Sequence, residues 1–374
     1  MNGIRSIGLK TWINTLFNNQ FKVVAWWIWL IIISKLVRYT VLYETLVKAS
    51  IGWSYLSVLN SHQACLGGIS LSSDDVINPS DNALFLLQIF SYFGVTSYYG
   101  YEILLTIIGN AVLFYIIRKC RSRYSWIESL FIVIGIMTIN VFAFNLSKDV
   151  IQLLLFVVLF IMMKDIHNSR IRNALSLAFV IAIAALLFRL YYMLLVYFFL
   201  AAYVADRIMR NVSNRWVRMI AMWIMITCSY LAILYIVQQI LPGYHDEMLR
   251  VRSRESDATT DIRLLFNSQE LWLWGLDYMI MILRLLFPVE LILFGPKFLA
   301  FLGVQLTYTI AFLYAFWHKI SVEGIERIAV LIYLAFVGMS ATFEPDFGSW
   351  IRHECIIFPV LLIALGLNRQ KMER

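Results

Sequence analysis

Apolar segments of roughly 15–20 residues recur along the whole chain and are separated by short polar turns. Segments of about that length can cross the hydrocarbon core of a membrane as α-helices. The sequence is 61% hydrophobic and only 14% charged, which excludes a soluble globular protein. We therefore predict an all-α, polytopic integral membrane protein with about ten transmembrane helices (a range of roughly 9–12) and some short or re-entrant helices.

The chain is predicted to form a single membrane domain from residue 1 to residue 374. Residues 45–82 would make a first outer loop and residues 241–270 a second, because both are polar and rich in turn formers or charges. Residues 83–92 are too short to span, and residues 271–297 are predicted to be an interfacial or broken helix. The first span is expected to act as an uncleaved targeting signal.

The positions of the charged residues indicate more about the orientation in the membrane than the formal net charge of +8 does. If the spans alternate, 19 of the 31 Lys and Arg fall in the two termini and four short loops on one side of the membrane. The positive-inside rule makes that side cytoplasmic and argues against nucleic acid as the partner of the basic residues. The turns at 45–82, 145–149, 189–192, 241–270 and 343–354 then share the outer face.

The four cysteines and five histidines are scattered along the sequence. Their spacing forms no CxxC pair and no zinc-binding pattern, so the cysteines are expected to be free thiols or small apolar residues. We accordingly predict no metal site and no cofactor.

Residues 343–354 bring a dense group of polar side chains into this apolar chain. Its members are Glu344, Asp346, Ser349, Arg352, His353 and Glu354. We expect Ser349 to cap the following helix, which places Arg352 and His353 in its first turns. A helix N-terminus with an arginine beside carboxylates and a histidine can bind an anion and move a proton. The alternative is a plain polar turn that a Glu344–Arg352 pair closes.

Two further outer turns hold candidate ligand-binding residues. Asp149 suits a helix N-terminus as a cap, whereas Lys148 gains nothing from the helix dipole there and suggests an anionic ligand. Arg189 follows a long apolar run, so it either faces the protein interior with a partner or extends toward the membrane surface. Tyr191 and Tyr192 are expected either in the aromatic belt of the membrane interface or in a wall on which a sugar stacks.

The two outer loops carry charged patterns that fit more than one role. Arg250, Arg252 and Arg254 alternate with other residues, so in an extended chain they would point the same way and could bind a phosphate. A solvated charge run explains them equally well. Asp74 and Asp75 fit either a loop start or a general base or metal ligand.

Lys35 and Arg38 lie within the outer half of the first predicted span. A spacing of three residues puts both on one face of a helix. Because a charge within an apolar span is costly, we expect them either to extend to the interface or to face a polar cavity.

Three short pieces of sequence carry a resemblance to a known family. They are Asn145-Leu-Ser-Lys-Asp149, Phe188-Arg-Leu-Tyr-Tyr192 and Glu344-Pro-Asp-Phe-Gly-Ser-Trp-Ile-Arg-His-Glu354. With arginines and acids on the outer loops of a many-span chain, they resemble patches of bacterial polysaccharide polymerases of the Wzy type, which join O-antigen or capsule repeat units. The Asp74-Asp75 pair is also similar to catalytic acids in the first outer loop of multi-span glycosyltransferases of the GT-C fold.

The resemblance implies a glycosyltransferase, namely a repeat-unit polymerase of the bacterial cytoplasmic (inner) membrane, with both termini cytoplasmic and its active site facing the outside. It would transfer a polyprenyl-diphosphate-linked glycan to a lipid-linked acceptor repeat unit in O-antigen, capsule or exopolysaccharide biosynthesis. Membrane lipid, a chain-length regulator and a flippase would be its partners. The alternatives are a GT-C-type enzyme that adds one sugar from a polyprenyl phosphate, and a flippase for lipid-linked glycan.

For the polymerase, the chemistry requires cations for the diphosphate and a base for the acceptor hydroxyl. The predicted catalytic residues are Glu344, Asp346, Arg352 and His353, and either carboxylate or the histidine would be the base. The residues expected to bind the substrate and its diphosphate are Lys148, Asp149, Arg189, Tyr192, Arg250, Arg252 and Arg254.

Overall fold

The computed structural model describes residues 20–42, 94–95, 97–120, 125–144, 149–164, 166, 170–188, 190–240, 260–266, 270–320, 324–344 and 346–366. Most of these residues are helical, and the others lie in turns or irregular segments, apart from an isolated antiparallel bridge between Asp261 and Asp346. The predicted all-α class is therefore confirmed for the described part of the chain. The predicted first outer loop, the re-entrant segment at 83–92 and most of the second outer loop lie outside the described residues.

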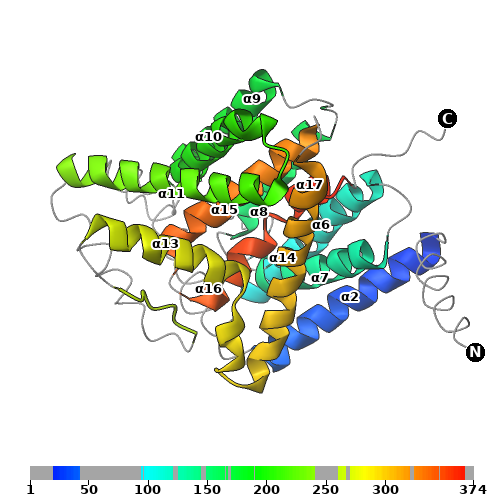
Figure 1. Cartoon of the computed structure of the whole chain (residues 1–374). Helices are drawn as coiled ribbons and strands as arrows, with labels where there is room; N and C mark the ends of the chain where they lie inside the picture. The colour runs from blue at the N-terminus through cyan, green and yellow to red at the C-terminus, as the bar shows by residue number, and fades with distance from the viewer. Residues whose placement is uncertain are drawn as a thin grey trace, which may run out of the picture.

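The helices follow the apolar segments of the sequence closely (Figure 1). Those before the second outer loop are α2 (Gln20–Thr40), α6 (Tyr98–Lys119), α7 (Trp126–Phe142), α8 (Asp149–Met163), α9 (Ile171–Phe188), α10 (Tyr192–Ile208), η5 (Met209–Asn211) and α11 (Arg215–Ile240). Those after it are α13 (Leu271–Leu286), η6 (Val289–Ile292), η7 (Pro296–Phe298), α14 (Leu299–Lys319), α15 (Ile325–Phe343), α16 (Phe347–Cys355) and α17 (Phe358–Ala364).

Several helices are long and apolar enough to cross a membrane. Among the described residues there are six such helices, and a seventh span if the bent pair α16 and α17 counts as one. Three shorter apolar helices lie at Trp126–Phe142, Asp149–Met163 and Ile171–Leu187. These helices suggest a multi-pass membrane protein, and the more precise figure of about ten spans stays a prediction.

α15 forms the centre of the bundle (Figure 1). It is buried from Ile325 to Thr342, and it packs against α10, α13, α14 and α17. Close packing is possible at Gly338, whose carbonyl accepts a hydrogen bond of 2.7 Å from the Tyr278 hydroxyl of α13. A helix of 19 residues is about 28 Å long, close to the thickness of a bilayer core. The two ends of α15 therefore mark two ends of the bundle.

The first turn of α15 is held by a buried ion triad, which consists of Asp206, Arg218 and Arg327. Asp206 of α10 forms ion pairs with Arg218 of α11 and with Arg327 of α15. All three side chains are buried, and Arg327 Nη2 also donates to the Asp206 carbonyl at 3.4 Å. The triad thus joins three helices at the end of the bundle where α15 begins.

The last apolar segment forms a broken helix and not one continuous span. α16 ends at Cys355, α17 begins at Phe358, and the axes of the two helices differ by 63°. Pro359 explains the break, because its ring would clash with the carbonyl of Cys355 in a continuous helix and it has no N–H to donate. The break separates the polar α16 from the apolar α17.

The segment predicted to be an interfacial or broken helix contains one helix and two short 3₁₀ turns. α13 ends at Leu286, just before Pro288, and η6 and η7 follow it. Asp277 of α13 accepts backbone hydrogen bonds from Leu265 and Phe266, and Arg284 pairs with Glu290 at 2.7 Å. Asp277, Arg284 and Glu290 therefore each form a hydrogen bond or an ion pair with a residue nearby in the sequence.

Candidate functional site

The candidate site lies where α8 begins, α15 ends and α16 follows. We call it the turn cluster, and it consists of Asp149, Glu344, Arg352 and His353. Asp149 is the first residue of α8, Glu344 directly follows α15, and the other two lie in α16. The structure thus brings together residues from two of the turns that the charge pattern assigned to one face.

His353 lies between two carboxylates of the turn cluster. Its Nδ1 donates a hydrogen bond of 2.6 Å to Glu344 Oε1, which fixes the ring by a charge-assisted contact. The other ring nitrogen, Nε2, lies 3.6 Å from Asp149 Oδ1. A histidine whose Nδ1 is held in this way can exchange a proton through Nε2.

Arg352 is the exposed cation of the turn cluster. Its Nε lies 3.3 Å from Asp149 Oδ2, and 39% of its side chain is exposed compared with 3% for Asp149. A guanidinium has N–H donors on three nitrogens, so the contact of Nε leaves the two terminal nitrogens for other groups. The geometry therefore gives Glu344 and Arg352 different partners, His353 and Asp149, where the sequence suggested that they pair with each other.

Asp346 has a structural position at the start of α16. Its side chain accepts a hydrogen bond of 2.9 Å from the Ser349 backbone N–H and is the N-cap of the helix. The expectation that Ser349 caps this helix is therefore wrong, since Ser349 supplies the capped N–H instead. Thr260 contributes a further contact to the Asp346 carboxylate at 3.4 Å, and its carbonyl accepts from Phe347 N at 3.2 Å.

These contacts connect the end of the second outer loop to the candidate site. Thr260 and Asp261 both meet the start of α16, and the bridge between Asp261 and Asp346 is antiparallel. Asp261 also pairs with the exposed Arg263 at 3.1 Å. A third turn predicted for the same face therefore lies against residues 343–354.

The carboxyl of Glu354, which follows His353 of the turn cluster in the sequence, lies inside the protein. Glu354 is buried, its Oε1 accepts a hydrogen bond of 3.0 Å from Gln305 Nε2, and the Tyr333 hydroxyl also donates to it. These contacts tie α16 to α14 and α15. The sequence placed Glu354 in the polar stretch but gave no signal for its partners, because they come from distant apolar helices.

The tyrosines of the 189–192 turn pack beside the cluster. The Tyr191 ring centroid lies 5.4 Å from that of Phe343 at the end of α15. Tyr192 is buried, and its hydroxyl donates to Gln152 Oε1 at 2.7 Å. Tyr192 therefore joins α10 to α8, and we do not include it among the groups that contact a substrate.

The remaining predicted site residues lie outside the described residues. They are Lys148, Arg189, Arg250, Arg252 and Arg254, together with the Asp74-Asp75 pair. Lys148 directly precedes Asp149 in the sequence, and Arg254 lies six residues before Thr260. Within the described ranges, no group of three or more His, Cys, Asp or Glu side chains is arranged to hold a metal ion.

No protein-family model matches this chain, no curated protein is detectably similar to it, and no solved structure resembles it.

Proposed function

We propose that this chain is a repeat-unit polymerase that transfers a polyprenyl-diphosphate-linked glycan to a lipid-linked acceptor on the outer face of the membrane. The observation that carries the proposal is the turn cluster, in which a histidine held by Glu344 lies beside a partly exposed arginine. This combination offers a proton acceptor and an anion-binding group at one end of a helical bundle. The sequence resemblance to Wzy-type polymerases supports the same function.

The transfer would form one glycosidic bond and break one bond to phosphate. The acceptor hydroxyl oxygen attacks the anomeric carbon of the donor sugar, and the bond from that carbon to the diphosphate oxygen breaks. The proton of the hydroxyl passes to a base, and polyprenyl diphosphate leaves as the anion. The protein therefore needs a base near the hydroxyl and cations near the leaving oxygen.

We assign the base function to the Glu344–His353 pair and the stabilisation of the leaving group to Arg352. Asp346 is a weaker candidate for the base, because its carboxylate already caps α16. Asp149 holds Arg352 by its Nε, which orients the guanidinium toward a ligand. Removal of one preorganised donor to a developing anion lowers the rate by about 10²–10³-fold in well-studied enzymes.

The test is to express Arg352→Ala in a strain that lacks this gene and to analyse the surface glycan by gel electrophoresis. We expect single repeat units on the lipid carrier in place of a polymer ladder, at an amount of membrane protein matched by immunoblot. Arg207→Ala is the control, because Arg207 is exposed and lies near the other end of α15. Full-length polymer from Arg352→Ala would contradict the assignment of Arg352.

The deletion strain itself separates the proposal from its alternatives. A polymerase predicts single repeat units exposed on the outer leaflet when the gene is absent. A GT-C-type enzyme predicts a glycan that lacks one sugar, and a flippase predicts substrate trapped on the inner leaflet. Either of the last two results would contradict the polymerase proposal.

A further inference from the structure

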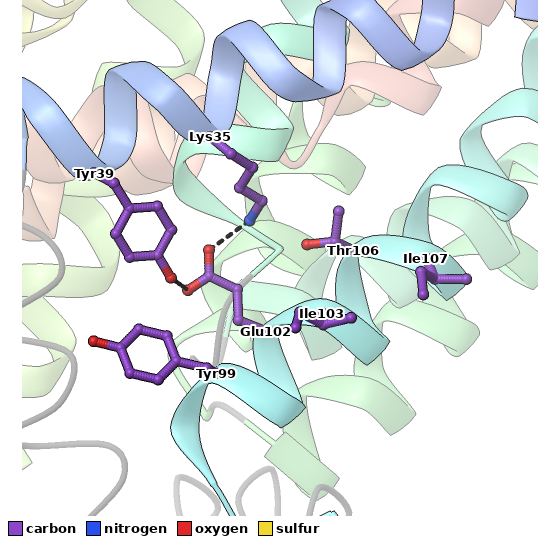
Figure 2. A pocket seen from close by; sticks show the side chains of 7 residues that line it. All are labelled: Lys35, Tyr39, Tyr99, Glu102, Ile103, Thr106 and Ile107. Atoms are coloured by element: carbon purple, nitrogen blue, oxygen red, sulfur yellow. Dashed lines mark hydrogen bonds and ion pairs between the residues drawn. The ribbon is translucent and has the colours of Figure 1, made fainter.

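The groove between α2 and α6 combines charged side chains with an exposed apolar surface. It has a volume of about 380 Å³ and is lined by Lys35, Tyr39, Glu102, Ile103, Thr106 and Ile107, among others. Figure 2 shows Lys35, Tyr39 and Glu102 pointing toward one another, and the Thr106 oxygen is directed toward the same space. None of these residues belongs to the turn cluster.

Lys35 and Glu102 line the polar end of the groove, and the buried Arg38 lies next to Glu102. Lys35 Nζ donates to Glu102 Oε1 at 2.6 Å, and Arg38 Nε lies 3.3 Å from the same oxygen. The Tyr39 hydroxyl donates to Glu102 Oε2 at 2.7 Å. Lys35 therefore faces the groove, whereas Arg38 is buried in the protein and does not extend to the interface. These side chains leave the polar end with one positive charge in excess.

Two polar groups at this end retain hydrogen-bonding capacity. An ammonium has three N–H donors, and those of Lys35 meet two acceptors, Glu102 Oε1 and the Phe144 carbonyl at 2.8 Å. The Thr106 Oγ1 is buried and has no hydrogen-bond partner among the described residues. A buried polar group is normally satisfied, and this hydroxyl lines the same groove as the Lys35 ammonium, so the two offer a ligand a pair of hydrogen-bonding groups.

The other end of the groove is an exposed apolar surface. Ile103 and Ile107 are 61% and 63% exposed, and a spacing of four residues puts them on one face of α6. Only 17% of the apolar stretch Val23–Thr40 of α2 is buried, so the groove opens between two helices with lipid-facing surfaces. A ligand that fits must therefore carry an anion at one end and a hydrocarbon chain at the other.

We propose that the α2–α6 groove binds a phosphate-bearing membrane lipid, with the phosphate on Lys35 and the chain along Ile103 and Ile107. The excess positive charge selects the anion, and the exposed isoleucines contact the chain. Lys35 also bonds to the Phe144 carbonyl, just before the turn that leads to Asp149. The lipid phosphate would lie at the end of α7 that leads into the turn cluster, whether or not the chain is a polymerase.

The test uses the purified full chain in detergent and native mass spectrometry with short-chain phosphatidic acid. Diacylglycerol of the same chain length and inorganic phosphate serve as separate probes, because the first lacks the anion and the second lacks the chain. Lys35→Met removes the charge, and Ile107→Trp fills the groove while it leaves the polar end intact. The matched controls are Lys119→Met and Ile108→Trp, on exposed residues of α6 outside the groove.

We expect the wild-type chain to bind phosphatidic acid more tightly than either partial probe. Each groove variant should weaken that binding about tenfold, the effect of losing one charge-assisted hydrogen bond or the contact of the chain. The control variants should bind as the wild type does. Equal affinity of Ile107→Trp and the wild type would overturn the proposal, as would equal affinity for phosphatidic acid and either partial probe.

Discussion

The two ends of α15 carry ionic clusters that differ in burial and in composition. At its start, the buried ion triad joins one carboxylate to two guanidiniums, and all of its side chains are at most 4% exposed. At its end, the turn cluster contains two carboxylates, a histidine and an arginine that is 39% exposed. One cluster is closed to solvent, and the other presents a cation to it.

The difference indicates two roles for charge in the same apolar bundle. The triad has more cations than carboxylates, yet it lies where no solute can reach it, so its contacts serve to fix α10, α11 and α15 relative to one another. The turn cluster includes a titratable ring and an exposed guanidinium, which are the groups that bind and protonate ligands. We therefore propose that the triad stabilises the fold and that the turn cluster binds ligands.

The largest effect is expected for Asp206→Asn, which breaks the triad without a change in size. Two buried guanidiniums would lose their counter-charge, and the loss of one partner from a buried pair costs about 3–5 kcal/mol. We expect little folded protein in the membrane and a lower unfolding temperature in detergent. Arg207→Gln is the control, because that neighbour is exposed. If Asp206→Asn unfolded at the wild-type temperature, the buried ion triad would not stabilise the fold as proposed.

The next effect is expected for His353→Asn, which separates proton transfer from packing. The Asn amide can replace Nδ1 as the donor to Glu344, but it cannot act as a general base. We expect a loss of about 10²–10⁴-fold in the rate of polymer formation per amount of protein, the usual contribution of a general base. Unchanged polymer synthesis by this variant would exclude His353 from the chemistry.

The smallest effect is expected for Asp346→Ala, which removes the N-cap of α16. Loss of an N-cap costs about 0.5–2 kcal/mol, and we expect the unfolding temperature in detergent to fall accordingly. Ser349→Ala is the matched control, since Ser349 contributes its backbone N–H and keeps it in the variant. If Ser349→Ala lowered the unfolding temperature more than Asp346→Ala, the capping geometry would be wrong.

The sequence predicts most of the described helices well, because all of the long ones coincide with a local apolar run. The apolar runs at residues 101–117 and 298–317 correspond to α6 and α14, and the break after α16 has its cause in Pro359. The burial of Arg218 and Arg327 could not be predicted in this way. Both belong to the basic residues that the positive-inside rule places in loops, and only packing against Asp206 shows that they are internal.

The sequence also predicts the members of the turn cluster but not their pairing. Arg352, His353 and Glu344 are close in sequence, and Asp149 belongs to another turn of the same predicted face. Their partners depend on how α8 and α15 pack, which a residue pattern does not encode. The contacts of Glu354 with distant helices are hidden for the same reason, whereas the Asp346 cap is a local contact that lies within reach of a sequence pattern.

The most direct test of the central claim is the double variant Glu344→Gln, Arg352→Gln in a strain that lacks this gene. Both substitutions keep the side chains of the turn cluster polar but remove one negative and one positive charge. We predict that the chain still accumulates in the membrane, unlike Asp206→Asn, and that the surface glycan consists of single repeat units. Full-length polymer at a matched amount of protein would show that the turn cluster only closes a turn, and it would contradict the proposed function of this site.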